Sequence, residues 1–151
     1  VVSVLDDALT ATSVPAELVI LEVTESKLPE DVASVMSSLT RMRLKGCGIS
    51  IDDFGTGFSS MEQLRRFPFT ELKIDRAFVN GAHAKPSAKA IFESSVDLAR
   101  RLGMSSVAEG VEDEADLALC RALGVDLIQG YYIARPMFPE AVVEWARVRG
   151  H

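Results

Sequence analysis

The chain has 151 residues, of which 48% are hydrophobic and 25% are charged, and its formal net charge is −6. This composition is that of a folded globular protein, and the length suffices for one domain with a substantial core. The acidic balance argues against a protein that binds DNA or RNA through a basic face. No apolar run is long enough to span a membrane and no signal peptide is recognisable, so we expect a cytoplasmic protein.

Two further features concern the setting of the chain. Cys47 and Cys120 lack the close spacing of a redox motif or a zinc site, so we expect two reduced thiols. The sequence opens on Val1 without an initiator methionine, which leads us to expect a part of a larger protein.

Apolar spacing and turn residues predict that strands and helices alternate along the chain. The predicted helices cover residues 1–12, 29–45, 60–67, 87–102, 113–123 and 139–145. The predicted strands cover residues 18–25, 48–52, 71–75, 105–109 and 126–129, and a polar loop covers 80–86. The apolar run at 18–21 predicts a strand that is buried on both faces. Five strand–helix units with short connections predict an α/β domain with a parallel sheet.

Polar side chains close all five predicted strands. They are Glu22, Asp52 with Asp53, Lys73, Glu109 and Gln129. In parallel α/β folds, and above all in (β/α)8 barrels, functional sites lie at the carboxyl ends of the strands. Carboxylates that meet there repel one another unless cations bridge them, and hard oxygen ligands without histidine or cysteine favour Mg²⁺ or Mn²⁺ over zinc. The pattern therefore predicts a site for one or two divalent cations.

Lys73 is the single cation among these strand ends. It could hold a phosphate oxygen or position a metal-bound water, and two metals that hold a phosphodiester for in-line attack are an established arrangement. An enolase-like proton abstraction with Lys73 as the base is a further reading. Gly55 and Gly57 permit a tight turn after Asp53.

Several residues also have a purely structural interpretation. Glu25 and Glu112 would then be solvated loop acids, and Asp75 would pair with Arg76. Tyr131 and its neighbour would be packing residues on their spacing alone.

Five motifs follow one another in order. They are Glu22-Val23-Thr24-Glu25-Ser26, Asp52-Asp53-Phe54-Gly55-Thr56-Gly57-Phe58-Ser59-Ser60, Lys73-Ile74-Asp75-Arg76, Glu109-Gly110-Val111-Glu112 and Gln129-Gly130-Tyr131. Together they resemble the C-terminal portion of an EAL domain, the bacterial phosphodiesterase module that acts on cyclic di-GMP. The resemblance covers nearly the whole of residues 1–151, and five ordered motifs are far more specific than any one of them.

The resemblance implies a portion of a modified (β/α)8 barrel that hydrolyses cyclic di-GMP to linear pGpG with Mg²⁺ or Mn²⁺. It implies metal ligands at Glu22, Asp52, Asp53 and Glu109, and catalytic roles for Lys73 and Glu109. It implies contacts to the nucleotide from Lys73, Gly110, Val111, Glu112, Gln129 and Tyr131. It implies that Glu25, Gly55 and Gly57 support the loop after the paired aspartates.

One departure from the family pattern is marked. The Glu-Ala-Leu motif, whose glutamate is a metal ligand in the family, is absent, and so is the asparagine of the following strand. A full (β/α)8 barrel takes about 250 residues. We therefore expect the complete parent to be the enzyme and the 151-residue chain alone to be inactive or very slow.

The alternative to an enzyme is a truncated, non-catalytic module that binds cyclic di-GMP or a protein partner. The resemblance also implies a homodimer, and we expect regulatory domains upstream of Val1.

Overall fold

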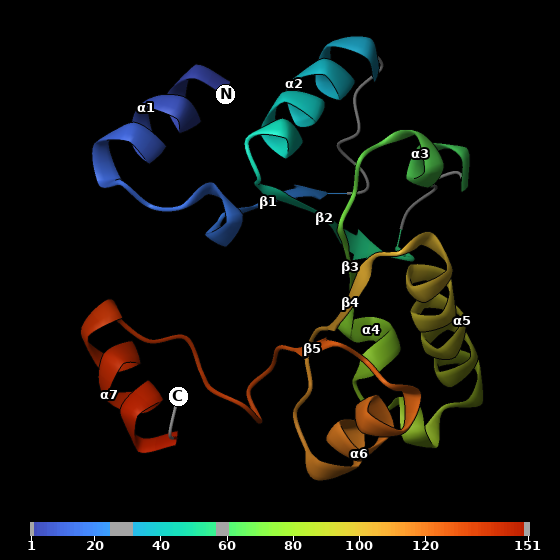
Figure 1. Cartoon of the computed structure of the whole chain (residues 1–151). Helices are drawn as coiled ribbons and strands as arrows, with labels where there is room; N and C mark the ends of the chain where they lie inside the picture. The colour runs from blue at the N-terminus through green and yellow to red at the C-terminus, as the bar shows by residue number, and fades with distance from the viewer. Residues whose placement is uncertain (1, 25–31, 57–60, 150–151) are drawn as a thin grey trace.

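The computed structural model describes residues 2–24, 32–56 and 61–149 (Figure 1). Five strands form one parallel sheet in which each strand pairs with the next strand along the chain. The strands are β1 (Ile20–Thr24), β2 (Gly48–Phe54), β3 (Glu71–Ile74), β4 (Ser105–Ala108) and β5 (Leu127–Ile128). Parallel neighbours require a crossover connection, and helices supply it here. The predicted α/β class and the five consecutive strand–helix units are confirmed.

The helices lie on two sides of this sheet. They are α1 (Val2–Thr12), α2 (Val32–Leu44), α3 (Met61–Arg66), α4 (Arg76–Val79), α5 (Pro86–Leu102), α6 (Glu114–Leu123) and α7 (Pro139–Arg149). Two 3-10 turns, η1 (Ala16–Leu18) and η3 (Ala82–Ala84), complete the described elements. Figure 1 shows α2, α3, α5 and α6 along one side, whereas α1 and α7 stand apart on the other. Among these residues no helix combines the length and the apolar character that a membrane crossing needs.

Alternation along the central strands separates a core face from a polar face. Ile49 and Ile51 of β2 are fully buried in the hydrophobic core, as is Phe92 of α5. Successive side chains of a strand point to opposite faces. Asp52 and Lys73 therefore project from the face that looks away from the helices α2, α3, α5 and α6.

Helix ends that the sequence predicts are present. Asp113 caps α6 because its Oδ1 accepts a hydrogen bond of 2.8 Å from the backbone N–H of Asp116. Helix α5 ends at Gly103, as expected from the sequence. The predicted helix start at Ser60 lies outside the described residues.

Two local predictions differ from the structure. The apolar run that begins at Leu18 predicts a strand buried on both faces, but residues 16–18 form η1 and Ile20 is 48% exposed. This prediction is wrong because β1 lies at one end of the described sheet, where Ile20 has no cover. The predicted polar loop over residues 80–86 contains the turn η3, and helix α4 before it is not predicted, since a single helical turn has no apolar periodicity to detect.

Candidate functional site

Lys73 lies at the centre of the polar face near the carboxyl ends of the strands. Its Nζ is 2.8 Å from Asp52 Oδ1, 2.8 Å from Glu109 Oε1 and 2.9 Å from Glu22 Oε1. The side chain of Lys73 is only 7% exposed. One ammonium thus contacts carboxylates from three strand regions: Glu22 of β1, Asp52 of β2 and Glu109 directly after β4. The strand-end pattern of the sequence predicts this convergence.

This environment keeps Lys73 charged. Burial alone would lower the pKa of Lys73, but hydrogen bonds to Asp52, Glu109 and Glu22 outweigh it and raise the pKa above its ordinary value. A catalytic base must be neutral to accept a proton. The structure therefore does not support the enolase-like reading in which Lys73 abstracts a proton.

Asp52 and Asp53 are adjacent, yet the structure brings both toward Glu109. Asp53 has a left-handed backbone with φ of 58°, and the register between β2 and β3 shifts between Ile51 and Phe54. Such a bulge re-aims side chains that would otherwise point to opposite faces. Consequently one carboxylate oxygen from each of Asp52, Asp53 and Glu109 lies within 4.8 Å of the others.

The three acids form a suitable ligand set for a hard divalent cation. Burial raises the pKa of Asp53, and the neighbouring charge of Asp52 raises it further. Burial also raises the pKa of Glu109, although Lys73 opposes the shift. Carboxylates that repel one another in this way are relieved by a bound cation, and oxygen ligands suit Mg²⁺, Mn²⁺ or Ca²⁺.

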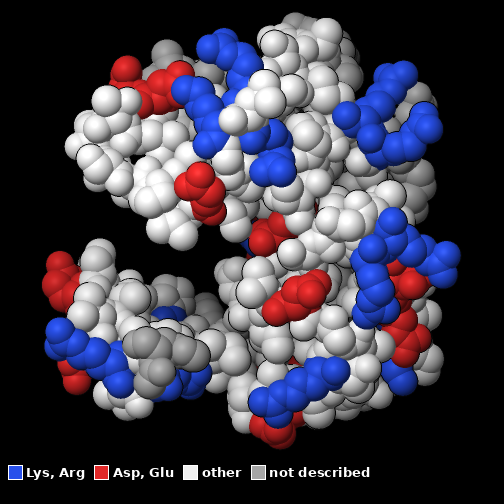
Figure 2. Space-filling view, in the orientation of Figure 1, with Lys and Arg blue, Asp and Glu red and all other residues white. Residues whose placement is uncertain are grey.

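A cavity of about 300 Å³ adjoins this cluster. It is lined by Asp53, Asp75, Arg76, Glu109, Gly110, Glu112, Gln129, Gly130 and Tyr131. Figure 2 shows acidic atoms at the inner end of a hollow that opens between the α1 side and the α7 side. The cavity can therefore hold a ligand next to the carboxylates, provided that cations offset their charge.

Tight backbone packing shapes the loop between β4 and α6. A Cβ atom at Gly110 would lie 2.3 Å from the Cβ of Arg76, and Gly110 has φ of 70°. At Gly130 a Cβ atom would lie 2.1 Å from the carbonyl oxygen of Val111. Only glycine fits at these two contacts, so the chain segments that line the cavity are held against one another.

Apart from Val111, the predicted site residues separate into three groups. The residues gathered at the cluster or the cavity are Glu22, Asp52, Asp53, Lys73, Glu109, Gly110, Glu112, Gln129 and Tyr131. Gly55 packs close to Phe78, and a Cβ atom there would lie 2.8 Å from Phe78 Cε2. Glu25 and Gly57 lie outside the described residues.

Val111 is predicted to contact the nucleotide, but its side chain lies elsewhere. Its side chain is fully buried in the hydrophobic core and does not line the cavity. Its backbone instead donates to Gln129 O at 3.2 Å and accepts from Tyr132 N at 3.0 Å. The residue therefore supports the cavity wall through its main chain.

Asp75 and Arg76 line the cavity, although the sequence suggests only that they pair with each other. Asp75 instead caps α4 by accepting from Ala77 N at 2.8 Å, and no ion pair joins it to Arg76 in the described structure. Their place directly after β3 is the signal that could have marked them.

Comparison with known proteins places the chain in a family. The family model of the EAL domain matches residues 1–136. The cyclic di-GMP phosphodiesterase RocR of Pseudomonas aeruginosa is 43% identical over 129 residues, which are 85% of this chain and 33% of that protein. The cyclic di-GMP phosphodiesterase PA2567 of the same organism is 42% identical over 84% of this chain and 22% of its own length. The chain thus spans a third or less of these two curated relatives.

Solved structures agree with this match. The PaMucR phosphodiesterase in complex with c-di-GMP is 42% identical with a TM-score of 0.85, and the match covers 91% of this chain and 56% of that one. The EAL domain of Mycobacterium smegmatis DcpA is 32% identical with a TM-score of 0.90, over 97% of this chain and 66% of that one. Klebsiella pneumoniae BlrP1, solved as a manganese/cy-diGMP complex, is 33% identical with a TM-score of 0.82. That match covers 89% of this chain and 34% of the BlrP1 chain. The predicted portion of an EAL-type barrel is confirmed, and the chain belongs to the EAL domain family.

Proposed function

We propose that residues 1–151 are the C-terminal part of a metal-dependent EAL domain that hydrolyses cyclic di-GMP to linear pGpG. The observation that carries the proposal is the convergence of Glu22, Asp52 and Glu109 on Lys73, beside a cavity of about 300 Å³. Relatives that are named cyclic di-GMP phosphodiesterases support the same reaction. The relatives therefore point to a cyclic dinucleotide as the substrate class, and the carboxylate cluster suits a metal-assisted attack on a phosphodiester.

Glu22, Asp52, Asp53 and Glu109 would hold one or two cations of the Mg²⁺ or Mn²⁺ type. When bound, such cations activate a water molecule and neutralise phosphoryl charge. The donor set fits them because it offers only carboxylate oxygens, and oxygen atoms of three of these acids lie within 4.8 Å of one another. One solved relative, the manganese/cy-diGMP complex of BlrP1, supports a divalent cation of this kind.

The chain's own residues have distinct tasks in this reaction. Lys73 orients Asp52 and Glu109 through contacts of 2.8 Å and provides positive charge next to the phosphodiester. Glu109 accepts the proton of the attacking water, whose oxygen forms the new bond to phosphorus. The bond from phosphorus to the ribose 3′ oxygen breaks, and that oxygen takes up a proton. Glu112, Gln129 and Tyr131 border the space for the nucleotide.

Hydrolysis of cyclic di-GMP by the full-length protein that carries this chain tests the proposal. With Mg²⁺ or Mn²⁺ present we expect pGpG, detected by liquid chromatography, and we expect none after addition of EDTA. A well-folded full-length protein that binds the metal and yields no pGpG would refute the proposal. We further propose that the 151-residue chain alone is inactive or nearly so, and turnover by that purified chain would overturn this corollary.

One observation favours a second candidate function. The Glu-Ala-Leu motif is absent from residues 1–151, so the chain itself holds an incomplete version of the family's ligand set. A non-catalytic module that binds cyclic di-GMP would account for this. Titration calorimetry separates the two functions, since a receptor binds cyclic di-GMP without added metal and leaves it intact.

The proposal extends to the cellular context of the protein. We place the domain in the cytoplasm, as a homodimer with a regulatory domain upstream of Val1. Size-exclusion chromatography with light scattering measures the oligomeric state of the full-length protein, and a monomer at micromolar concentration would contradict the dimer.

A further inference from the structure

We infer that Asp116 is a positioning residue for the ligand site, because its buried carboxylate holds the loop from Glu109 to Glu112 in place. The inference rests on the proposed function, since it assigns that loop to cyclic dinucleotide binding. Asp116 lies on α6, away from the carboxylate cluster, and no motif of the sequence marks it. It is 1% exposed, which is unusual for an aspartate.

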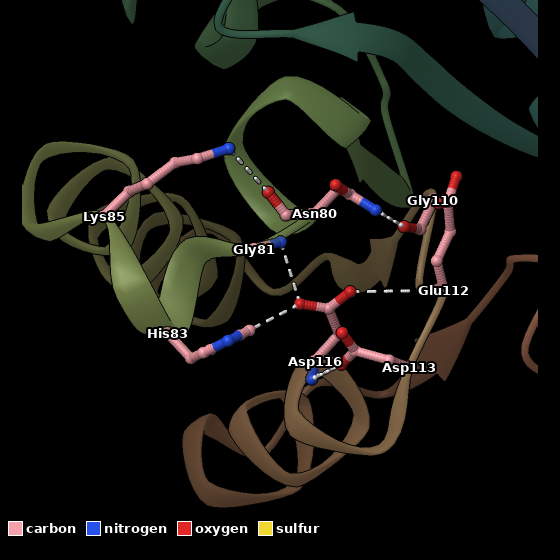
Figure 3. A network of polar contacts seen from close by, with 8 residues as sticks. All are labelled: Asn80, Gly81, His83, Lys85, Gly110, Glu112, Asp113 and Asp116. Atoms are coloured by element: carbon pink, nitrogen blue, oxygen red, sulfur yellow. Dashed lines mark hydrogen bonds and ion pairs between the residues drawn. The ribbon is translucent and has the colours of Figure 1, made fainter.

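Both oxygens of the Asp116 carboxylate accept hydrogen bonds from backbone N–H groups (Figure 3). Oδ1 accepts from Gly81 N at 2.9 Å, and Oδ2 accepts from Glu112 N at 3.3 Å. Gly81 belongs to the connection that follows β3 and α4, whereas Glu112 belongs to the loop that follows β4. One side chain therefore ties together the segments that leave two neighbouring strands.

A second tie joins the same two segments. Asn80 Nδ2 donates to the carbonyl oxygen of Gly110 at 3.3 Å, and Lys85 Nζ approaches the carbonyl oxygen of Asn80 at 3.4 Å (Figure 3). The loop is thus held at Gly110 by Asn80 and at Glu112 by Asp116 of α6. The first residue of this loop, Glu109, is held by Lys73 through the contact of 2.8 Å.

The surroundings of Asp116 indicate a structural tether rather than a metal ligand. His83 Nδ1 lies 3.4 Å from Asp116 Oδ1, and Asp113 Oδ1 accepts from Asp116 N at 2.8 Å (Figure 3). Because both oxygens of Asp116 already accept backbone hydrogen bonds, its charge is compensated within the fold.

The tether affects ligand binding because it positions Glu112, which lines the cavity. Glu109 is fixed separately, by its ion pair with Lys73. Loss of either tie made by Asp116 loosens the far end of the loop and leaves the ion pair at Glu109 intact. Displacements of about 1 Å are enough to impair a preorganised site. We therefore expect weaker substrate binding with little change in the chemical step.

Asp116→Asn in the full-length protein tests this inference. The amide retains the shape of the carboxylate but turns an N–H donor toward Gly81 N or Glu112 N, so one of the two ties is lost. We expect KM for cyclic di-GMP to rise about tenfold while kcat changes less than about twofold. Hydrogen exchange should accelerate at least about tenfold at the amide that loses its acceptor, which is Gly81 N–H or Glu112 N–H.

Asp126→Asn is the matched control. Asp126 also accepts two hydrogen bonds, from Ser106 N and Ser106 Oγ at 2.8 Å each, but at the amino end of β4. Both variants remove one negative charge and lower thermal stability, and only Asp116→Asn should raise KM. Unchanged KM and unchanged exchange at both Gly81 and Glu112 in Asp116→Asn, or equal KM increases in both variants, would overturn the inference. A wild-type protein without hydrolysis defeats the proposed function, and exchange at Gly81 and Glu112 then still decides whether Asp116 holds the loop.

Discussion

Replacing Lys73 by Met removes the ammonium that three carboxylates share while nearly keeping the volume of the side chain. Two of the contacts, to Asp52 and Glu109, are 2.8 Å long, and these acids are 22% and 17% exposed. The third partner, Glu22, is 53% exposed and contributes little. Breaking a buried ion pair costs about 3–5 kcal/mol of unfolding free energy. Because Asp52 and Glu109 are partly exposed, we expect Lys73→Met to lose about 3 kcal/mol at neutral pH.

The loss should shrink in acid. Burial raises the pKa of Glu109 and Lys73 opposes that shift, so the pKa in Lys73→Met lies higher still. A carboxyl group whose pKa is raised by folding destabilises the fold once it ionises, and protonation removes the penalty as the pH falls through the raised pKa. The difference in unfolding free energy between the variant and the wild type should therefore fall by at least half between about pH 7.5 and about pH 4.5.

Urea denaturation of the metal-free chain, followed by far-ultraviolet circular dichroism in EDTA, measures both values. Lys45→Met is the matched control, because Lys45 pairs with Asp6 at the surface, where the two side chains are 40% and 31% exposed. We expect that control to cost less than about 1 kcal/mol at either pH. Equal losses for the two variants, or a loss for Lys73→Met that does not change with pH, would refute the reasoning.

Three further predictions concern the site and the core. Gly110→Ala should destabilise the chain more than Gly103→Ala in thermal melts, because both residues have φ of 70° but only Gly110 has a neighbour, Arg76, within 4 Å of an added Cβ. Asp53→Asn should weaken Mn²⁺ binding at least about tenfold in calorimetry, and equal affinity would remove Asp53 from the ligand set. Burial raises the pKa of the Cys120 thiol to about 11, so Ellman's reagent at pH 8 should modify it only at the rate of unfolding. Rapid modification of the native chain would contradict the buried environment.

Much of the fold can be predicted from sequence because each strand contains apolar residues and has a polar residue near or just after its carboxyl end. The carboxyl-end rule for parallel sheets then places Glu22, Asp52, Lys73 and Glu109 at one edge. The sequence cannot show that one ammonium contacts all three acids. That arrangement depends on strand register, which spacing along the chain does not specify.

The remaining features depend on contacts between distant residues. The bulge that re-aims Asp53 arises in the pairing of β2 with β3, and nothing local in the sequence requires a left-handed aspartate there. The carboxylate of Asp116 meets Gly81 across 35 positions of the chain. The motif that contains Val111 predicts a contact to the ligand, whereas its side chain fills the core.

The order of the strands in the sheet equals their order in the chain, and this bears on how the protein is made. During synthesis each new strand finds its pairing partner already outside the ribosome, because that partner was translated one strand–helix unit earlier. No strand of the described sheet must wait for a later one to fill a gap between its neighbours. Co-translational folding can therefore proceed unit by unit in the direction of translation, with short loop closures at every step.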